Sequence, residues 1–211
     1  MEKEKLEILD KFIQENRGKR KFAQSVELSV NFKGIDFSKQ DDRLNVEISL
    51  PNGKGKESSV IVFADDRNIA DSAGKLGARV IGSAQLPSAS SDKAMLRNML
   101  KSELVAQPSL MPTIAKNLGQ LLGPRNKMPK PLLGSDISGA IKRAIDSVQL
   151  RSKGKYLPTV HCVVGKEGME TQKIAENIDA VMAALAKKPG NAHIRSAYVK
   201  LTMSKPVKII G

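Results

Sequence analysis

The apolar run VIVFA at residues 60–64 decides the fold class of the central part of this chain. Five apolar residues without polar alternation are typical of a strand that is buried on both faces of a parallel sheet. A helical pattern follows over 67–76, then Gly77 as a C-terminal cap and a second short strand, ARVIG, at 78–82. Strand, helix and strand in this order predict an α/β unit with a parallel sheet.

The alternation of strands and helices continues toward the carboxyl terminus. A helical pattern covers 91–101, and ELVAQ at 103–107 predicts the next strand. Ser109 is expected to cap a helix that runs to Leu122, and Ser135 to cap a helix whose apolar stripe comprises Ile137, Ile141, Ala144, Ile145 and Val148. Helices on both faces of one sheet make three layers, so the centre is predicted to be a three-layer, Rossmann-like parallel α/β domain.

The two flanks of this centre carry a different pattern. Their strands alternate apolar and polar residues, as half-buried strands of an antiparallel sheet do. The expected strands are 26–32, 44–50, 160–164, 196–203 and 207–210, and the expected amphipathic helices are 3–16 and 173–188. Both chain ends together are therefore predicted to build one split antiparallel α+β sandwich domain, into which the centre is inserted.

Charge also divides the chain into blocks. Lys and Arg number 35 against 22 Asp and Glu, a net charge of +13. Residues 1–66 carry a net charge of −1, residues 67–155 of +10 and residues 156–211 of +4. We therefore predict that residues 67–155 form the inserted domain and that 1–66 plus 156–211 form the split domain. The connections are expected near 63–67 and 152–159.

The composition favours a polyanionic partner in the cytoplasm. A strong excess of basic residues favours binding of nucleic acid, although a merely solubilising surface is the alternative. Five Phe, two Tyr and no Trp are few for a protein that stacks single-stranded bases, so a folded RNA read by shape is the better expectation. The single cysteine, Cys162, suits a reducing compartment. Neither a membrane span nor a secretory signal is expected.

Motifs of enzymes and metal sites are absent from the sequence. It contains no phosphate-binding G-x-x-x-x-G-K-[ST] loop, and its glycine cluster NGKGK at 52–56 precedes a buried strand instead of following one. The candidate soft ligands are His161, Cys162 and His193, and the first two point to opposite faces of a strand. Cys162 is therefore interpreted as a core residue. We expect no enzymatic activity, no metal and no cofactor.

Several unusual segments carry a resemblance to a known family. They are KFAQSVEL (21–28), GIDFSKQDDRLNVEISLPNGKGK (34–56), LGQLLGPRNKMPKP (118–131), HCVVGK (161–166), ENIDAVM (176–182) and AYVKLTMSKPVKI (197–209). In this order they resemble the ribosomal protein L-one family along essentially the whole chain. The residues around Asn126 and Met128, and the sequence SKP after Met203, are similar to those of the archaeal branch of the family.

This resemblance implies a function as well as a two-domain fold. Family members bind an irregular helical region of large-subunit rRNA and form the mobile stalk near the tRNA exit site, which assists release of deacylated tRNA. Many also repress translation of their own mRNA. A monomer outside the ribosome is expected. The alternatives are a general architectural nucleic-acid-binding protein, which excess duplex DNA would displace, and a nucleotide-dependent enzyme, which would bind ATP, GTP or NAD.

The resemblance also implies the RNA-binding residues. On the split domain they are Lys21, Phe22, Ser25, Glu27, His161, Gly165, Lys166, Thr202, Met203 and Ser204. Lysines neutralise phosphates, and hydroxyls as small as those of Ser25 and Thr202 reach the ribose 2′-OH. A carboxylate repels phosphate, so Glu27 is expected to accept a hydrogen bond from a 2′-OH or a base amino group.

Each of the more telling residues has a structural alternative. Phe22 and Met203 would contact ribose or base faces, but both are also plausible core residues. Glu27 lies on an expected strand, where it could pair with a neighbouring lysine instead of RNA. The hydroxyl groups are uninformative individually, so the set depends on the family resemblance.

A second candidate contact lies in the inserted domain, within LLGPRNKMPKP at 121–131. Gly123 and Pro124 are expected to break the preceding helix, and two later prolines to keep the loop extended. The loop would then expose Arg125, Lys127 and Lys130 for a weaker contact with the RNA backbone. A rigid turn with solvated charges is the alternative. Net charge favours the inserted domain and the motifs favour the flanks, and we place the principal site by the motifs.

Overall fold

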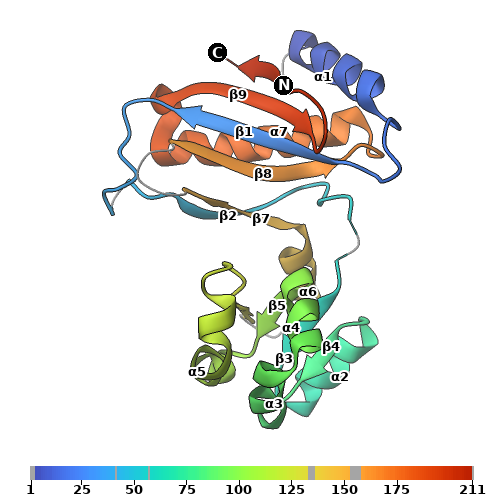
Figure 1. Cartoon of the computed structure of the whole chain (residues 1–211), viewed down its shortest axis with the longest axis vertical. Coiled ribbons are helices and arrows are strands. Elements are labelled where there is room, and N and C mark those ends of the chain that lie inside the picture. Colours follow the sequence, from blue (N-terminus) through green and yellow to red (C-terminus); the bar gives the residue numbers. More distant parts are fainter. Residues whose placement is uncertain (1–2, 41, 57, 133–135, 153–157, 211) are drawn as a thin grey trace. The chain divides into compact units, whose positions relative to one another are not determined.

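The computed structural model describes residues 3–40, 42–56, 58–132, 136–152 and 158–210 (Figure 1). The chain divides into two compact units. Unit 1 comprises both flanks, 1–56 and 146–211, and unit 2 comprises 57–145. No described helix has the length and apolar character needed to cross a membrane.

Unit 1 contains a four-stranded sheet with the order β10-β9-β1-β8, in which all neighbours are antiparallel. A second, two-stranded sheet pairs β2 with β7. The elements are α1 (Lys3–Asn16), β1 (Ser25–Phe32), β2 (Asn45–Ser49), β7 (Ser147–Arg151), β8 (Thr159–Lys166), α7 (Thr171–Leu185), β9 (Ile194–Leu201) and β10 (Val207–Ile210). The predicted α+β class of the flanks is confirmed.

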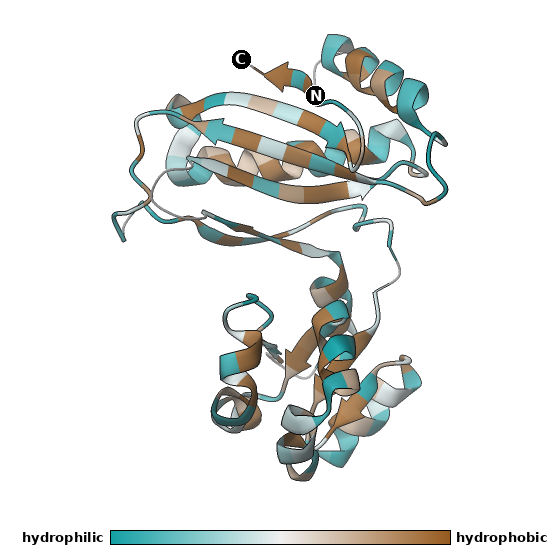
Figure 2. Cartoon of the chain, in the orientation of Figure 1, coloured by the Kyte–Doolittle hydropathy of each residue, from teal (hydrophilic) through white to brown (hydrophobic). Residues whose placement is uncertain are grey.

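The alternation in the sequence sets the two faces of the larger sheet. Along β1 every second side chain is buried, and these are Val26, Leu28, Val30 and Phe32. They belong to one core with apolar residues of α1 and α7, and Figure 2 shows the alternating hydropathy along the strands. The side chains between them, such as Glu27, are partly exposed. The opposite face of the sheet is therefore polar.

Unit 2 is built around a parallel sheet with the order β4-β3-β5-β6. Its elements are β3 (Val60–Phe63), α2 (Arg67–Lys75), β4 (Arg79–Ile81), α3 (Leu86–Ser91), α4 (Lys93–Lys101), β5 (Glu103–Ala106), α5 (Met111–Leu122), β6 (Lys130–Pro131) and α6 (Ile137–Asp146). On one face Ile61 and Phe63 pack with α3, α4 and α5; on the other, Val60 and Val62 pack with α2 and α6. This confirms the three-layer parallel α/β class.

The division between the units differs from the one drawn at 66/67 and 155/156. β3 precedes residue 67 but is an inner strand of the sheet of unit 2, so it belongs to that unit. β7 precedes residue 156 but pairs with β2, with Val148 opposite Ile48, so it belongs to unit 1. Placing Val148 in the apolar stripe of α6 was therefore wrong. The helix passes into the strand without a Gly or Pro between them, which removes the usual boundary signal.

These boundaries change the distribution of charge. Unit 1 contains 23 basic and 15 acidic residues, a net charge of +8, whereas unit 2 contains 12 and 7, a net charge of +5. The larger positive charge thus lies on unit 1, which also carries the principal RNA-binding residues that the family resemblance implies. The apparent conflict between charge and motifs came from the position of the boundaries.

The expected helix caps do not all form. Gly77 follows α2 with a φ of +76°, a left-handed conformation that favours glycine, as predicted. Ser109 does not cap α5: it lies inside a 3₁₀ turn, Pro108–Leu110, and α5 begins at Met111 without a side-chain cap. Prolines at 108 and 112 set this start. Ser135 lies outside the described residues.

One buried amide fastens the loop between β2 and unit 2 to helix α7. Asn177 is fully buried, and its Nδ2 donates to the carbonyl oxygens of Gly53 and Val164 at 2.9 and 2.8 Å. Its Oδ1 accepts from the backbone N–H of Asn52 at 3.0 Å. Both ends of this amide are thus engaged with backbone groups, which fixes the loop at residues 51–54.

Candidate nucleic-acid interface

Three strand ends of unit 1 meet at one end of the larger sheet. β1 begins at Ser25, opposite Lys166 at the end of β8, and β9 ends at Leu201, opposite Val26. The Ser25 N–H donates to Thr202 Oγ1 at 3.1 Å, and the Thr202 N–H donates to the Ser25 carbonyl oxygen at 3.2 Å. The predicted segments 21–27, 165–166 and 202–204 are therefore brought together, although they lie far apart in the sequence.

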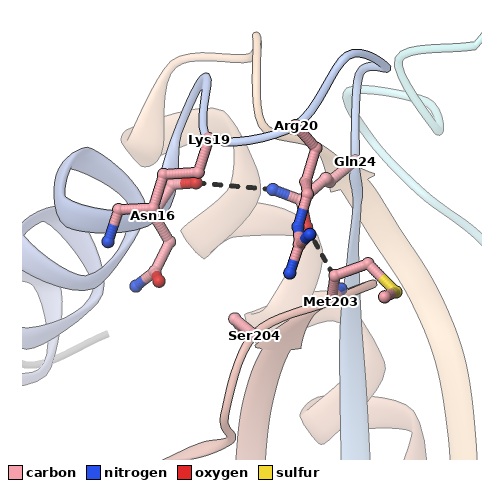
Figure 3. A pocket seen from close by; sticks show the side chains of 6 residues that line it. All are labelled: Asn16, Lys19, Arg20, Gln24, Met203 and Ser204. Carbon is pink, nitrogen blue, oxygen red and sulfur yellow. Dashed lines mark hydrogen bonds between the residues drawn. The ribbon is translucent and has the colours of Figure 1, made fainter.

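Gln24 joins these segments from inside, and it was not among the predicted residues. It is 2% exposed, and its Nε2 donates to Glu167 Oε2 at 3.1 Å and to the Asn16 carbonyl oxygen at 3.4 Å. Its Oε1 accepts from the Met203 N–H at 3.1 Å (Figure 3). The available signal was a polar residue at an inward position of the β1 alternation, in phase with Val26 and Leu28.

A β-bulge places Lys166 on the polar face of the sheet. The register shifts between Val26, which is opposite Gly165, and Glu27, which is opposite Val163, so Val164 is an extra residue on β8. If β8 paired with β1 without this bulge, alternation from Val163 would turn Lys166 toward the core. With it, Lys166 lies opposite Ser25 on the same side of the sheet.

Two large apolar side chains project into solvent at this end. Phe22 is 51% and Met203 is 56% exposed, and they are two of five exposed large hydrophobic residues among the described ones. Phe22 precedes Gln24 by two residues, and Met203 is hydrogen-bonded to the Gln24 side chain. The structure therefore removes the alternative that either residue belongs to the core.

Glu27 pairs with a lysine, which was the structural alternative to an RNA contact. Lys200 is its cross-strand neighbour, and Lys200 Nζ lies 3.8 Å from Glu27 Oε2. Both side chains are 36% exposed, and pairs of this kind contribute about 0–1 kcal/mol. Such a weak pair leaves the carboxylate accessible from the polar face. Lys200 itself was not predicted, because its register with Glu27 is not visible in the sequence.

Two of the expected hydroxyls shape the turn after β9. Thr202 Oγ1 accepts from Ser25, and Ser204 Oγ accepts from the Leu201 N–H at 2.9 Å and donates to the Lys205 carbonyl oxygen at 3.0 Å. Because these hydroxyls have partners inside the protein, they hold the 202–204 turn in one conformation. This leaves Met203 at the tip of a fixed turn.

Gly165 and His161 differ from each other in exposure. Gly165 is buried, and a Cβ there would lie 3.1 Å from Ile174 Cγ1 and from Met169 Sδ, so this position is a packing position and not a surface one. His161 is exposed on the polar face, opposite Ser29. Its neighbour Cys162 is buried, which raises the pKa of the thiol to about 12. The core role predicted for Cys162 is confirmed.

A basic run beside the predicted site was also missed. Residues 17–21 read RGKRK, and Arg17, Lys19, Arg20 and Lys21 are all exposed. Four cations within five residues are a recognisable signal for a polyanion-binding segment. The acidic residues of helix α1 concealed it when charge was counted over the whole block of residues 1–66.

In unit 2 the second candidate contact is only partly as expected. α5 ends at Leu122, as predicted, and Pro124 and Arg125 are exposed. Lys127 is not a free surface charge, however, because its Nζ donates to the Ser102 carbonyl oxygen at 3.2 Å and lies 3.8 Å from Glu103 Oε2. Lys130 is half-buried in the short strand β6. Of the three cations in this loop, Arg125 is the most accessible.

The assembled side chains suit binding and not catalysis. The sheet end of unit 1 combines cations, two exposed apolar side chains, a carboxylate and hydroxyls on a hydrogen-bonded frame. Among the described residues no group of three His, Cys, Asp or Glu side chains converges as a metal site. Such a surface can neutralise phosphates and contact ribose and base faces at the same time.

Comparison with known proteins gives consistent matches over nearly the whole chain. The model of the Ribosomal protein L1p/L10e family matches residues 10–205. The chain is 39% identical over 198 residues to the large ribosomal subunit protein uL1 of Pyrococcus abyssi, covering 91% of this chain and 89% of that protein. It is 40% identical over 215 aligned positions to the protein of the same name from Methanocella arvoryzae, covering 99% of each.

Proposed function

The chain belongs to the Ribosomal protein L1p/L10e family, in its archaeal-type branch, and on that premise we propose that the sheet end around Gln24 binds a folded region of large-subunit rRNA. Membership makes the chain a structural, non-enzymatic protein of the large ribosomal subunit. Its partner is the large-subunit rRNA and its location is the cytoplasmic ribosome. The alternative of a nucleotide-dependent enzyme is thereby set aside.

The exposed pair Phe22 and Met203 is the observation that supports this position of the RNA site. Exposed apolar side chains that gather at one place within a polar surface mark an interaction site, whereas isolated ones do not. Lys166 lies at the same end of the sheet, and the exposed basic run 17–21 directly precedes Phe22. This positive charge favours a polyanion over an apolar protein surface as the partner. A polyanion with apolar faces fits both properties, and RNA offers phosphates together with ribose and base surfaces.

The hydrogen bonds beneath the site favour recognition by shape. Met203 is held by Gln24, and Thr202 by Ser25, so the turn does not have to be ordered when RNA binds. A preorganised surface loses less conformational entropy on binding than a flexible one. The lysines then contribute a salt-dependent attraction to phosphate, and Ser25 and Glu27 remain for hydrogen bonds to 2′-OH or base groups.

The bound rRNA region would form the mobile stalk near the tRNA exit site, and through it the protein would assist release of deacylated tRNA. Family membership supports this part of the proposal. The tRNA in the exit site is then a transient partner. The loop with Gly123, Pro124 and Arg125 would add a weaker backbone contact from unit 2.

A site that recognises the fold of an RNA accepts other RNAs with the same fold. We therefore extend the proposal to the protein's own mRNA, whose translation it would repress by binding a stalk-like structure. Outside the ribosome the protein would act as a monomer, which light scattering of the purified chain would test. In competition, unlabelled rRNA stalk fragment should displace a bound mRNA leader, and the Met203→Ala substitution should weaken both complexes in parallel.

The decisive experiment compares binding of the rRNA stalk fragment with that of a scrambled hairpin, in the presence of excess duplex DNA. The wild-type protein should retain the stalk fragment, whereas an architectural protein would be displaced. Met203→Ala and Thr202→Ala should each weaken binding by about 1–2 kcal/mol through lost apolar contact or a disturbed turn. Leu76→Ala is the matched control, because Leu76 is also exposed but lies at the end of α2 in unit 2, outside both proposed RNA contacts. Equal affinity for both RNAs would refute the proposal.

A further inference from the structure

A pocket of about 420 Å³ opens beside Met203. Three segments form it: the end of α1, the stretch that leads into β1 and the turn after β9. It is lined by Asn16, Lys19, Arg20, Gln24, Met203 and Ser204 (Figure 3). Its volume lies within the range of roughly 300–1,000 Å³ typical of sites for small ligands. It is therefore large enough for one nucleotide but not for a helix.

The chain turns sharply to bring two cations to the rim of this pocket. Helix α1 ends at Asn16, and Gly18 has a φ of +71°, in the left-handed region that favours glycine after a helix. A Cβ at Gly18 would meet nothing within 4 Å, so the backbone conformation alone requires glycine here. Lys19 and Arg20 follow at once, and both are exposed.

The floor of the pocket and its rim differ in their hydrogen bonding. The Gln24 amide is engaged with Glu167, Asn16 and Met203, and the Ser204 hydroxyl with Leu201 and Lys205. Within the described part of the chain, no hydrogen bond or ion pair occupies the side chains of Lys19 and Arg20. In Figure 3 the Arg20 side chain extends over Gln24 toward the turn that carries Met203. The floor is thus satisfied while the rim offers two unneutralised charges.

We propose that this pocket binds one unpaired nucleotide of the same RNA, with its phosphate against Lys19 and Arg20 and its base against the Met203 thioether. The inference rests on the proposed function, because the pocket shares Met203 and Ser204 with the predicted RNA surface. An RNA strand in contact with Met203 on that surface brings its phosphates to the rim. The pocket thereby extends the RNA footprint across the end of α1, onto residues that the family motifs do not include.

Charge removal tests the phosphate contact. In the double variant Lys19→Gln/Arg20→Gln, the affinity for the rRNA stalk fragment should fall. The negative slope of the log association constant against log salt concentration should become shallower by about 1–2. The matched control is Lys187→Gln/Lys188→Gln, which removes the same charge from exposed lysines of unit 1 after the end of α7. The control should keep the wild-type slope. Unfolding by urea should be unchanged in both variants, since none of these lysines or Arg20 is buried.

Abasic substitution tests the base contact. Each unpaired nucleotide of the stalk fragment is replaced in turn by an abasic one, and binding is measured with wild type and with Met203→Ala. At one position the replacement should weaken wild-type binding severalfold and should have little further effect on the Met203→Ala variant. That coupling would assign the base to the pocket.

The outcomes separate this inference from the proposed function. If wild type does not distinguish the stalk fragment from a scrambled hairpin, both fail. If it does so and Lys19→Gln/Arg20→Gln retains the wild-type affinity and slope, the pocket contact alone is overturned. If the double variant loses affinity but no abasic position couples to Met203, the cations bind backbone phosphate only and the nucleotide in the pocket is overturned.

Discussion

The Gln24 Oε1 accepts a hydrogen bond from the Met203 N–H at 3.1 Å, across 179 residues of sequence. The same amide donates to Glu167, so one buried side chain joins the approach to β1, the segment after β8 and the turn after β9. The predicted RNA surface consequently exists only after both chain ends have assembled. Neither end can present it alone.

We predict that Gln24→Ala weakens RNA binding mainly through the 202–204 turn, which the Gln24 amide holds in place. The substitution leaves the buried Glu167 carboxylate and the Met203 N–H without their partner, which should lower the free energy of unfolding by about 1–3 kcal/mol. Because the turn is no longer held, binding of the stalk fragment should weaken at a temperature where the variant is fully folded. Urea unfolding and titration with the fragment measure the two effects.

Gln14→Ala is the control for Gln24→Ala. Gln14 donates to Asp10 on the exposed side of α1, so its loss should change neither stability nor affinity appreciably. If Gln24→Ala destabilises the protein while RNA affinity stays at the wild-type value, the turn keeps its conformation without the amide. In that case Gln24 supports the fold alone.

Two substitutions in the loop after α5 should affect RNA binding and folding stability separately. Arg125→Gln is expected to decrease the salt slope of rRNA binding by about 1 and to leave unfolding unchanged. Lys127→Ala should instead lower the free energy of unfolding by about 1 kcal/mol, because Lys127 bonds the Ser102 carbonyl oxygen. Salt titrations and urea unfolding of both variants check this. An unchanged slope in Arg125→Gln would show that this loop is a turn with solvated charges.

Asn177→Leu should destabilise the protein more than Gln24→Ala or Lys127→Ala does. It leaves the carbonyl oxygens of Gly53 and Val164 and the N–H of Asn52 without the amide that pairs with them. We expect a loss of about 2–4 kcal/mol in the free energy of unfolding. Asn191→Leu, at an exposed position, is the comparison. Similar unfolding midpoints for the two leucine variants would contradict a fastening role for Asn177.

Cys162 should make the stability depend on pH in alkaline solution. Burial raises the pKa of its thiol from 9.0 to about 12. The folded protein keeps the thiol neutral, so the stabilisation is complete below pH 9 and is lost as the pH rises from 9 toward 12, where the unfolded chain already ionises. Between about pH 8 and about pH 10 the free energy of unfolding of wild type should fall by about 1 kcal/mol more than that of Cys162→Ala. Parallel curves in urea titrations would exclude this.

The elements of both units were largely predictable because their periodicities are local. Helix α1 occupies the predicted residues 3–16, and the alternating strands of the flanks and the parallel strands of the centre appear within a few residues of their expected positions. β7 was missed because Val148 and Leu150 continue directly from a helical stripe. That single omission, with the misplaced β3, moved the unit boundaries and the charges assigned to each unit.

The supports of the candidate site were not predictable in the same way. Gln24, Lys200 and the bulge at Val164 act through partners that lie more than a hundred residues away, and neither register nor burial is visible in a single sequence. The run RGKRK at 17–21 is different, because its signal was local. Averaging charge over a long block concealed it. The roles toward RNA remain predictions for every residue that the family resemblance implies.

The extra residue in β8 divides that strand into two halves that obey opposite parity. Before Val164 the odd positions face outward, and Lys166 after it is an even position that does so as well. Whether an odd or an even position of β8 faces outward therefore depends on which side of Val164 it lies. Because of this bulge, Lys166 at the strand end faces outward while the residues before Val164 keep regular alternation. If every residue of β8 paired regularly with β1, the inward and outward positions would be exchanged after Val163 and Lys166 would turn inward.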